Sequence, residues 1–470
     1  MISYSPKLDN CPQSGNSINE KPCYNADEIL HHKEREGNTV GKWTKQVLAI
    51  AMTLALMCGM AVMGTVQAGA AGFETVPMIA SSYKDTFALK SDGTVWAWGA
   101  HYYAPYQGYP GMTADEIKRA LITPVQITGL GNVTAIAAGS NADPHILALK
   151  DDGTVWAWGN NTYGQLGNGT TERYGFSNTL VQVSGLNNVK AIAAGPYHSL
   201  ALKNDGTVWA WGWTWLGDGI GEQLTPVQVQ GLSNVTAISA GWEYSLVLKN
   251  DGTVWAWGGN YNGQLGDGTS EDRNTPVQVQ NLSNVKAIAA GTQLAIALKE
   301  DNTVWAWGLN NHGQLGDGTD IDSNTPIQVN GISDVTAIAA KGAFCIALKK
   351  DGTVWAWGRN NAGQVGDGTT TDRNTPIQVQ NLSDVTIEAG MFHGAALKSG
   401  GSVWVWGGYN PDKDMVIFSR TPVQVLGENG VGYLNLRSSS ITPEPPHFWD
   451  TWPGWLVWIL RYILFGWLWM

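Results

Sequence analysis

The sequence predicts an all-β fold, a seven-bladed β-propeller of four-stranded antiparallel blades, with an N-terminal export helix and a C-terminal Trp-rich apolar tail. The first observation is an octapeptide, Asp-Gly-Thr-Val-Trp-Ala-Trp-Gly, which recurs with slight variation. Its first tryptophan lies at Trp96, Trp156, Trp209, Trp255, Trp305, Trp355 and Trp404. A spacing of about 50 residues is typical of propeller blades. The second observation is a composition of 58 Gly and 24 Trp with 14% charged residues, which favours a turn-rich, strand-rich globule.

One repeat, residues 235–279, contains all four strands of a blade. The expected strands are Val235–Gly241, Ser245–Lys249, Thr253–Trp257 and Thr275–Val279. An Asp-Gly pair separates the second strand from the third. We expect it to form a type I′ hairpin turn, whose two central residues have positive φ.

The order of the strands within a blade follows from their composition. The fourth strand carries a proline, which lacks an N–H and is tolerated at a sheet edge, so this strand should be outermost. The first strand is rich in Ala and Gly, as the crowded centre of a ring requires. The paired tryptophans of the third strand are two residues apart and face one way. We interpret all fourteen as packing between blades rather than as ligand contacts.

The combined pattern resembles the regulator of chromosome condensation repeat. It is seen in residues 193–212, from the Ala-Ala-Gly corner to Trp-Ala-Trp-Gly, and in Asn-Tyr-Asn-Gly-Gln-Leu-Gly-Asp-Gly-Thr at 260–269. The resemblance covers about residues 76–436 and implies a seven-bladed propeller. The eukaryotic namesake exchanges guanine nucleotide on a small nuclear GTPase, using acidic and His side chains on one face and a projecting β-wedge. The family histidine is present here as His145, His198 and His393, whereas the other copies have Asp85, Tyr244, Leu294 and Phe344.

The N-terminal part of the chain indicates export. Residues 1–45 are polar, and residues 46–72 form an apolar segment that follows Lys42 and Lys45. Two interpretations remain open, a signal peptide cleaved after Ala68 or Ala70 and an uncleaved membrane anchor. The propeller should then occupy residues 73–437.

The C-terminal part indicates membrane association. A Ser/Pro linker, residues 438–447, precedes residues 448–470, which contain six tryptophans and the single basic residue Arg461. Tryptophan prefers the membrane interface, so we expect an interfacial or tilted anchor. The alternative is that this tail packs on the propeller. We expect an exported protein, extracellular or in the cell envelope and membrane-associated.

Charge and motifs exclude several classes of function. The net charge of −11 opposes nucleic-acid binding, which requires clustered Lys and Arg. We find no catalytic constellation, and we expect no enzymatic activity, no cofactor and no metal site. Calcium remains an alternative at aspartates of the Gly-Asp-Gly-Thr loops and just beyond them, such as Asp267, Asp272, Asp367 and Asp372, although Asp and Gly also form ordinary turns.

The two faces of an antiparallel propeller should differ. Loops that join first to second and third to fourth strands emerge on one side, which we name the variable face; the turns between second and third strands and the links between blades emerge on the other, the uniform face. Tyrosine and tryptophan dominate binding hot spots. The candidate partner-binding residues on the variable face are Tyr163, Tyr197, His198, Trp213, Trp215, Trp242, Tyr244, Tyr261, His312, Phe392 and His393.

These observations predict a monomeric, non-enzymatic scaffold that binds an unknown protein partner or a cell-surface component, such as a glycan, through the variable face. Secreted bacterial members of the repeat class that bind or inhibit other proteins suggest the same. The alternatives are a guanine-nucleotide exchange factor and a glycan-binding lectin. Side chains beside the Ala-Gly corner have an alternative role of their own, which is to pack the hub of the ring.

The tail prediction is tested by truncation after Ser440. Burial of an apolar segment contributes about 0.8 kcal/mol per methylene-sized group, so the tail should determine location and not folding. The truncated chain should be a soluble monomer released into the medium, while the full chain should sediment with membranes. A misfolded truncated chain, or a full chain soluble without detergent, would show instead that the tail is a packing element of the ring.

Overall fold

The structure is a computed structural model that describes residues 73–99, 123–172, 176–213, 217, 221–408, 417–427 and 430–437. Residues 1–72 and 438–470, with the predicted export segment, linker and tail, lie outside the described residues. Among the residues that are described, no helix has the length and hydropathy needed to cross a membrane.

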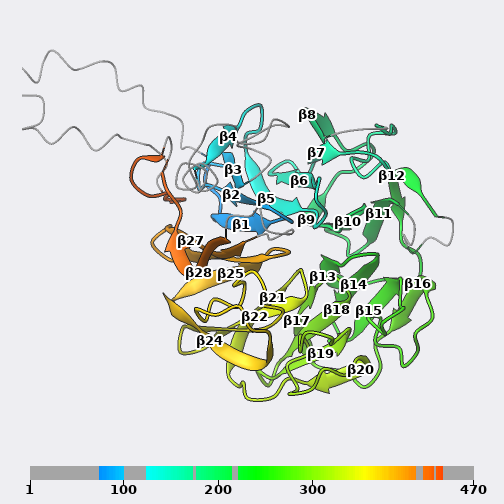
Figure 1. Ribbon diagram of the computed structural model, residues 1–470. Helices are drawn as coiled ribbons and strands as arrows, with labels where there is room; N and C mark the ends of the chain where they lie inside the picture. The colour runs from blue at the N-terminus through cyan, green and yellow to red at the C-terminus, as the bar shows by residue number, and fades with distance from the viewer. Residues whose placement is uncertain are drawn as a thin grey trace, which may run out of the picture. The chain divides into compact units, whose positions relative to one another are not determined.

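The described chain folds into seven four-stranded antiparallel sheets arranged around a common centre, which confirms the predicted propeller (Figure 1). Each sheet uses four strands that are consecutive in sequence. The innermost strands are β1 (Met78–Ser81), β5 (Val133–Ala138), β9 (Val189–Ala194), β13 (Val235–Ala240), β17 (Val285–Ala290), β21 (Val335–Ala340) and β25 (Val385–Ala389). The second strands are β2 (Asp85–Leu89), β6 (His145–Lys150), β10 (His198–Lys203), β14 (Tyr244–Lys249), β18 (Leu294–Lys299), β22 (Phe344–Lys349) and β26 (His393–Lys398).

The outer half of each blade carries the tryptophan pair and the outermost strand, which has a proline within it or next to it in every blade except the second. The third strands are β3 (Val95–Gly99), β7 (Val155–Asn160), β11 (Val208–Gly212), β15 (Val254–Gly258), β19 (Val304–Gly308), β23 (Thr353–Gly358) and β27 (Val403–Gly408). The outermost strands are β4 (Val125–Ile127), β8 (Phe176–Gln182), β12 (Gln223–Gln228), β16 (Arg273–Gln278), β20 (Ser323–Gln328), β24 (Arg373–Ser383) and β28 (Ile417–Gln424). The predicted order from centre to edge is therefore confirmed.

The turn between second and third strands differs from the expected type I′. In the fourth blade the Gly252 amide donates to the Lys249 carbonyl at 3.0 Å, and Gly252 has φ +76°, while Asp251 does not have positive φ. This is a type I turn followed by a left-handed glycine. The Asp251 carboxylate selects it by accepting hydrogen bonds from the Thr253 amide at 3.0 Å and the Thr253 hydroxyl at 2.6 Å.

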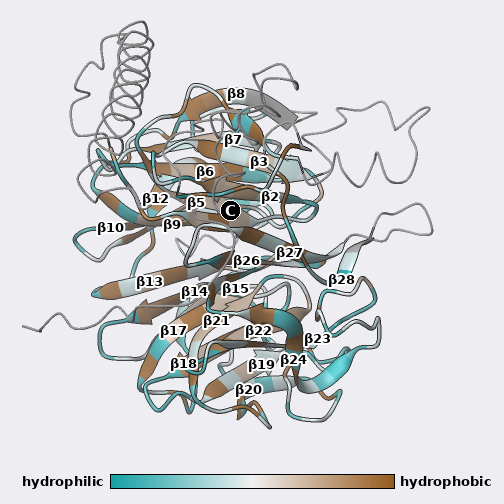
Figure 2. Cartoon of the chain, turned by 90° about the vertical axis from the view of Figure 1, so that its left-hand side faces the viewer, coloured by the Kyte–Doolittle hydropathy of each residue, from teal (hydrophilic) through white to brown (hydrophobic). Residues whose placement is uncertain are grey.

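The core lies between neighbouring blades, and the tryptophan pair builds it. The second tryptophan of each pair is at most 2% exposed, as at Trp307, which packs on Leu246 and Leu248 of the preceding blade. The first tryptophan reaches the same cluster from the rim, as at Trp305. The predicted packing role of the pairs is thus confirmed. Hydrophobic segments are seen in inner strands such as β17, whereas the outermost strand β24 is largely hydrophilic (Figure 2).

The first tryptophan of every blade also lies under a lysine from the end of the second strand. Distances from Nζ to the ring centroid run from 4.1 Å at Lys90 and Trp96 to 5.8 Å at Lys150 and Trp156. A cation over an indole face is attracted by the ring quadrupole. Each blade therefore supplies its own cation to the more exposed tryptophan of its pair.

The seam between blades is fixed by a hydrogen bond from the second indole. In four blades its Nε1 donates to a glutamine carbonyl of the preceding blade, as from Trp357 to Gln314 at 3.0 Å. Gly316 lies against this indole; an added Cβ would be 2.7 Å from Trp357 Nε1, and Gly316 has φ +71°. The motif Gly-Gln-Leu-Gly thus provides both the carbonyl that binds the indole and the space in which the indole lies.

The last blade meets the first one without exchange of strands. Strands β25 and β26 contact β1, and Trp98 and Ile79 pack with Leu397 and Val403 in one cluster (Figure 1). Residues 430–437 reinforce the junction, because Leu436 accepts from the Ser91 amide and donates to the Gly401 carbonyl, both at 2.9 Å. Closure therefore combines an ordinary seam with one C-terminal segment.

The seam is tested by a matched pair of glycine substitutions. Gly331 has φ +76°, and an added Cβ there would meet nothing within 4 Å, so Gly331→Ala should cost about 1–2 kcal/mol for its left-handed backbone alone. Gly316→Ala should cost about 1–3 kcal/mol more, because it also displaces the indole. Denaturant unfolding of both variants measures the difference. Equal losses in the free energy of unfolding would mean that the indole can be displaced without destabilising the contact between blades.

Candidate functional site

The structure separates the loops into the two faces expected from the strand order. On the variable face, the Glu243 carbonyl in the loop between β13 and β14 accepts from the Gly259 amide, directly after β15, at 2.8 Å. On the uniform face, the Val285 amide at the start of the next blade donates to the carbonyl of the turn residue Gly252 at 3.1 Å. The two kinds of loop are therefore held on opposite sides of the ring.

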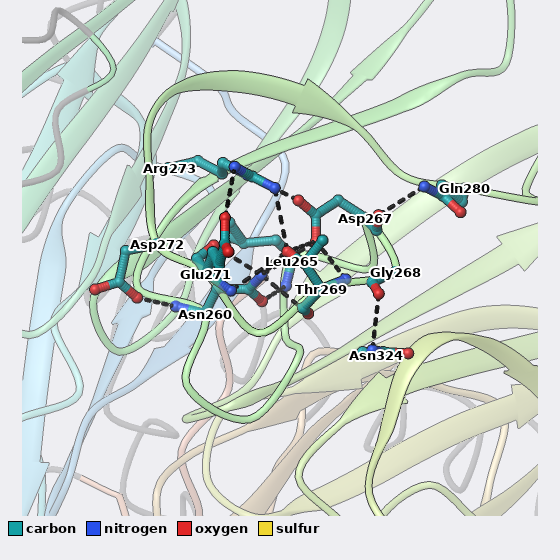
Figure 3. Close-up of polar contacts among 10 residues, drawn as sticks. All are labelled: Asn260, Leu265, Asp267, Gly268, Thr269, Glu271, Asp272, Arg273, Gln280 and Asn324. Atoms are coloured by element: carbon teal, nitrogen blue, oxygen red, sulfur yellow. Dashed lines mark hydrogen bonds and ion pairs between the residues drawn. The ribbon is translucent and has the colours of Figure 1, made fainter.

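The repeated loop between third and fourth strands is a polar clasp between blades (Figure 3). In residues 260–269, Asn260 is buried; its Oδ1 accepts from the Leu265 amide at 2.9 Å and its Nδ2 donates to Asp267 at 3.1 Å. The Gly268 carbonyl accepts from Asn324 Nδ2 of the next blade at 2.9 Å (Figure 3). The polar groups of this motif are engaged within the fold.

Those aspartates of the calcium alternative that lie in the described structure have protein partners. Asp267 accepts from Arg273 Nε at 2.8 Å and from the Thr269 hydroxyl at 2.7 Å, and Asp367 accepts from Arg373 Nε at 2.8 Å. Within the described ranges, no group of three or more His, Cys, Asp and Glu is arranged to hold a metal ion. Turn chemistry accounts for these loops.

Four of the predicted site residues form one aromatic cluster on the variable face. The Tyr163 ring stacks on Trp213 with centroids 5.2 Å apart and an interplanar angle of 30°. Tyr197 meets Tyr163 and Trp213 edge-on at 5.4 Å, and meets Trp242 edge-on at 5.9 Å. The four side chains come from the second, third and fourth blades, and all are half-buried. We name these four residues the aromatic cluster.

Glu243 lies beside the aromatic cluster and was not among the predicted residues. Burial, then the Asp272 carboxylate, raises the pKa of Glu243 above its usual range. Burial also raises the pKa of Tyr197, with smaller contributions from Tyr163 and Glu243. The available signal was its position directly after Trp242 at the Ala-Gly corner, where the equivalent residue of the third blade is Tyr197.

The other accessible candidates lie apart from the aromatic cluster. Tyr261 is 84% exposed. The Nδ1 atom of His312 is 2.7 Å from the Asp372 carboxylate of the next blade. Phe392 meets Tyr83 edge-on at 5.0 Å and lies under the Arg359 guanidinium at 5.4 Å. Trp215 lies outside the described residues.

Three further candidates are buried between neighbouring blades. They therefore have the alternative role considered for them, which is to pack the hub of the ring. His198, Tyr244 and His393 are 4%, 1% and 2% exposed, respectively, so their side chains are not available to a partner. His198 Nε2 is 3.1 Å from the Ser245 hydroxyl, and His393 Nε2 is 2.9 Å from the Thr86 hydroxyl, each in the following blade. The Tyr244 hydroxyl donates to the Leu294 carbonyl.

His145 shows why these histidines stay neutral. The Ser199 hydroxyl donates to the Gln165 carbonyl at 3.0 Å, so it accepts from His145 Nε2 at 2.7 Å. The proton is therefore on Nε2, and Nδ1 is a buried acceptor without a partner in the described structure. Burial lowers the pKa of His145 to about 3, and those of His198 and His393 to about 4.

A central cavity of about 260 Å³ is lined by the first strands and includes Lys341 and Glu388. Lys341 Nζ donates to the Ala138 carbonyl at 2.5 Å. Burial, opposed by Lys341, raises the pKa of Glu388 to about 7. The cavity solvates charge poorly, so burial there disfavours the charged forms of both Lys341 and Glu388.

Buried His145, His198 and His393 should make the propeller acid-sensitive. Their folded-state pKa values of about 3 to 4 lie below the unfolded value of about 6.5, so below pH 6.5 the unfolded chain binds more protons. Stability should therefore fall as pH drops from 6.5 toward 4. Glu388 acts in the opposite sense between about pH 4.5 and 7, because its folded-state pKa is raised to about 7.

Melting temperatures of the wild type and Glu388→Gln at pH 5 and pH 7 test both statements. The wild type should melt lower at pH 5. Glu388→Gln should widen the difference, chiefly by raising the melting temperature at pH 7, where ionisation of the buried carboxyl no longer opposes folding. Identical differences in the two proteins would show that Glu388 titrates normally.

Comparison with known families identifies the repeat. The model of the RCC1-like domain matches residues 62–346, and models of the regulator of chromosome condensation (RCC1) repeat match residues 335–364 and 351–397. The chain is 34% identical over 152 residues to the guanine nucleotide exchange factor SRM1 of Saccharomyces cerevisiae, which is 32% of this chain and 30% of SRM1. The matched segment likewise spans 35% of protein RCC1 of Candida albicans, so the chain covers only about a third of the length of these two relatives.

Solved structures show the same fold. Prp20p of Saccharomyces cerevisiae, described with its binding properties to Gsp1p and histones, is 26% identical with a TM-score of 0.53, covering 62% of this chain and 76% of that one. Human WBSCR16 is 22% identical with a TM-score of 0.59, covering 69% and 88%, and supports the fold alone. The family model covers more than half of the chain, and the seven blades agree with it. The chain belongs to the family of proteins with an RCC1-like domain.

Proposed function

We propose that this chain is a non-enzymatic, exported propeller scaffold that binds a protein partner, or a component of a cell surface, through its variable face. The observation that carries this proposal is the aromatic cluster. It gathers two tyrosines and two tryptophans, all half-buried, at positions where the blades differ from one another. Partly exposed Tyr and Trp on a rigid scaffold are the side chains that dominate protein-binding hot spots.

The proposed location rests on the sequence outside the described structure. Residues 46–72 would direct export, and residues 448–470 would hold the monomeric propeller at a membrane. One solved relative is described with protein partners in two structures: Prp20p with its binding properties to Gsp1p and histones, and the same protein, yeast RCC1 (Prp20), bound to Kap60. These partners belong to that relative, but they support protein binding as a use of this fold.

Nucleotide exchange is the second candidate, favoured by the similarity to SRM1 over a third of the chain. Export would separate this propeller from cytosolic GTPases, so we rank exchange below scaffolding. Release of fluorescent GDP from a GTPase captured by the full chain would reverse this order.

Affinity capture with the full chain from the native cell envelope, followed by cross-linking and mass spectrometry, would identify the partner. With that partner purified, Tyr163→Ala and Trp242→Ala on the variable face should each weaken binding by about 10-fold or more, as expected for hot-spot residues. Asp251→Ala on the uniform face should lower the melting temperature, because Thr253 loses its two hydrogen bonds, and should leave affinity unchanged. Loss of binding in Asp251→Ala at an unchanged melting temperature would mean that the uniform face is the binding face.

A further inference from the structure

Among the described residues, the aromatic cluster differs from the first tryptophans of the seven third strands in having no cation of its own. In each of the seven blades a lysine lies over the first tryptophan of the third strand, as Lys249 lies 5.3 Å from the Trp255 ring centroid. Among the described residues, no lysine or arginine of this chain lies over Tyr163, Tyr197, Trp213 or Trp242. Within the described part of the chain, the four aromatic rings thus gather with no positive charge over their faces.

A carboxylate stands beside these rings on a strained backbone. Glu243 has φ +134°, and it is the one residue in the described part of the chain, apart from Gly, Asn and Asp, with positive φ. Such a conformation is strained and persists only where the surroundings enforce it. Strain of this kind is concentrated at ligand sites, where it holds a side chain in place.

The surroundings of Glu243 enforce its position from both sides. The Trp242 amide donates to the Thr292 carbonyl of the next blade at 3.2 Å, and the Glu243 carbonyl accepts from the Gly259 amide at 2.8 Å. A Cβ at Gly258 would be 2.3 Å from that carbonyl, so glycine is required there. Trp242 and Glu243 are therefore fixed by backbone contacts before any ligand arrives, which lowers the ordering cost of binding.

We propose that the aromatic cluster and Glu243 bind the side chain of a lysine or arginine from a basic segment of a protein partner. The rings would contact the cation through their faces, and the Glu243 carboxylate would neutralise it. The inference rests on the proposed function, and it names the chemistry that the partner must present.

The geometry favours a cation over a sugar. Three of the four ring contacts are edge-on, with interplanar angles of 80°, 88° and 82°, so the four rings do not form one flat platform. Ring faces that point in different directions suit a compact cation, which is attracted to the face of a single ring, whereas a sugar ring stacks on an extended flat face. The adjacent carboxylates of Glu243 and Asp272 and the net charge of −11 also attract a basic partner.

Fluorescence anisotropy with the full chain tests the proposal. The probe is a fluorescein-labelled peptide of alternating Lys and Gly, and its matched control has Gln at every Lys position. The Lys peptide should bind and the Gln peptide should not. Glu243→Gln and Trp213→Ala should each weaken binding by about 5-fold, as loss of about 1 kcal/mol predicts. Each variant is used only if its melting temperature shows that it folds, and the isosteric Glu243→Gln keeps the test decisive if Trp213→Ala does not.

Two control variants separate the site from general acidity. Glu300→Gln removes the same charge in a turn of the uniform face, and Tyr433→Ala removes an exposed tyrosine that is not among the candidate partner-binding residues. Both should bind the Lys peptide within about 2-fold of the wild type. Equal weakening by Glu243→Gln and Glu300→Gln would overturn the proposal, as would binding of maltoheptaose that Trp213→Ala abolishes while the Lys peptide does not bind.

The purified partner distinguishes failure of this inference from failure of the proposed function. If Tyr163→Ala and Trp242→Ala weaken binding of the partner while Glu243→Gln does not, the variable face binds the partner but the cation site is wrong. If neither aromatic substitution changes the affinity for the partner, the proposed function itself is wrong. If all three substitutions weaken binding and the Lys peptide competes with the partner, both the proposed function and the cation site are supported.

Discussion

The seam between neighbouring blades is the contact on which the rest of the structure depends. The second tryptophan of each blade is buried against the blade before it, and its N–H is satisfied by a glutamine carbonyl where that bond is seen, as from Trp406 to Gln364 at 2.9 Å. A single blade cannot bury these rings, so the repeat is stable only as a closed ring. The glycines beside the indoles and the Asn-Asp clasps of the outer loops follow from this requirement.

The seams also decide which residues remain for function. The motif residues that recur in every copy are engaged in turns, clasps and seams, and the histidines at the Ala-Gly corner pair with hydroxyls of the next blade. Where the corner residue is Leu294 or Phe344, the facing residue of the next blade is Cys345 or Gly394 instead of a hydroxyl. Specific recognition is therefore left to side chains that do not repeat, and the aromatic cluster is built from these.

The fold could be predicted from sequence because the residue pattern that indicates the strand order recurs in seven copies. Proline marked the edge strand, small residues marked the hub, and the tryptophan pair marked the core. The turn type was wrong because Asp251 directs its carboxylate to Thr253 and favours a type I turn, a local contact that the Asp-Gly pair alone does not reveal. The buried roles of His198, Tyr244 and His393 depend on register between blades, which residue type does not encode.

The site was only partly predictable for a related reason. Aromatic residues on variable loops indicated Tyr163, Tyr197, Trp213 and Trp242, but only the ring geometry brings them together, while Tyr261 and Phe392 lie elsewhere. Glu243 was missed because its significance lies in a backbone conformation and in its neighbours across two blades. Sequence reasoning finds the residue types of such a surface, and the closure of the ring decides which of them meet.

The central claim is that the repeat uses one face for structure and the other for binding. Hydrogen–deuterium exchange of the full chain, with and without its captured partner, tests this most directly. The account predicts new protection in segments 161–165, 195–199, 211–213 and 241–244, with unchanged exchange in the turns at 250–253 and 300–303. Protection confined to those turns would contradict it.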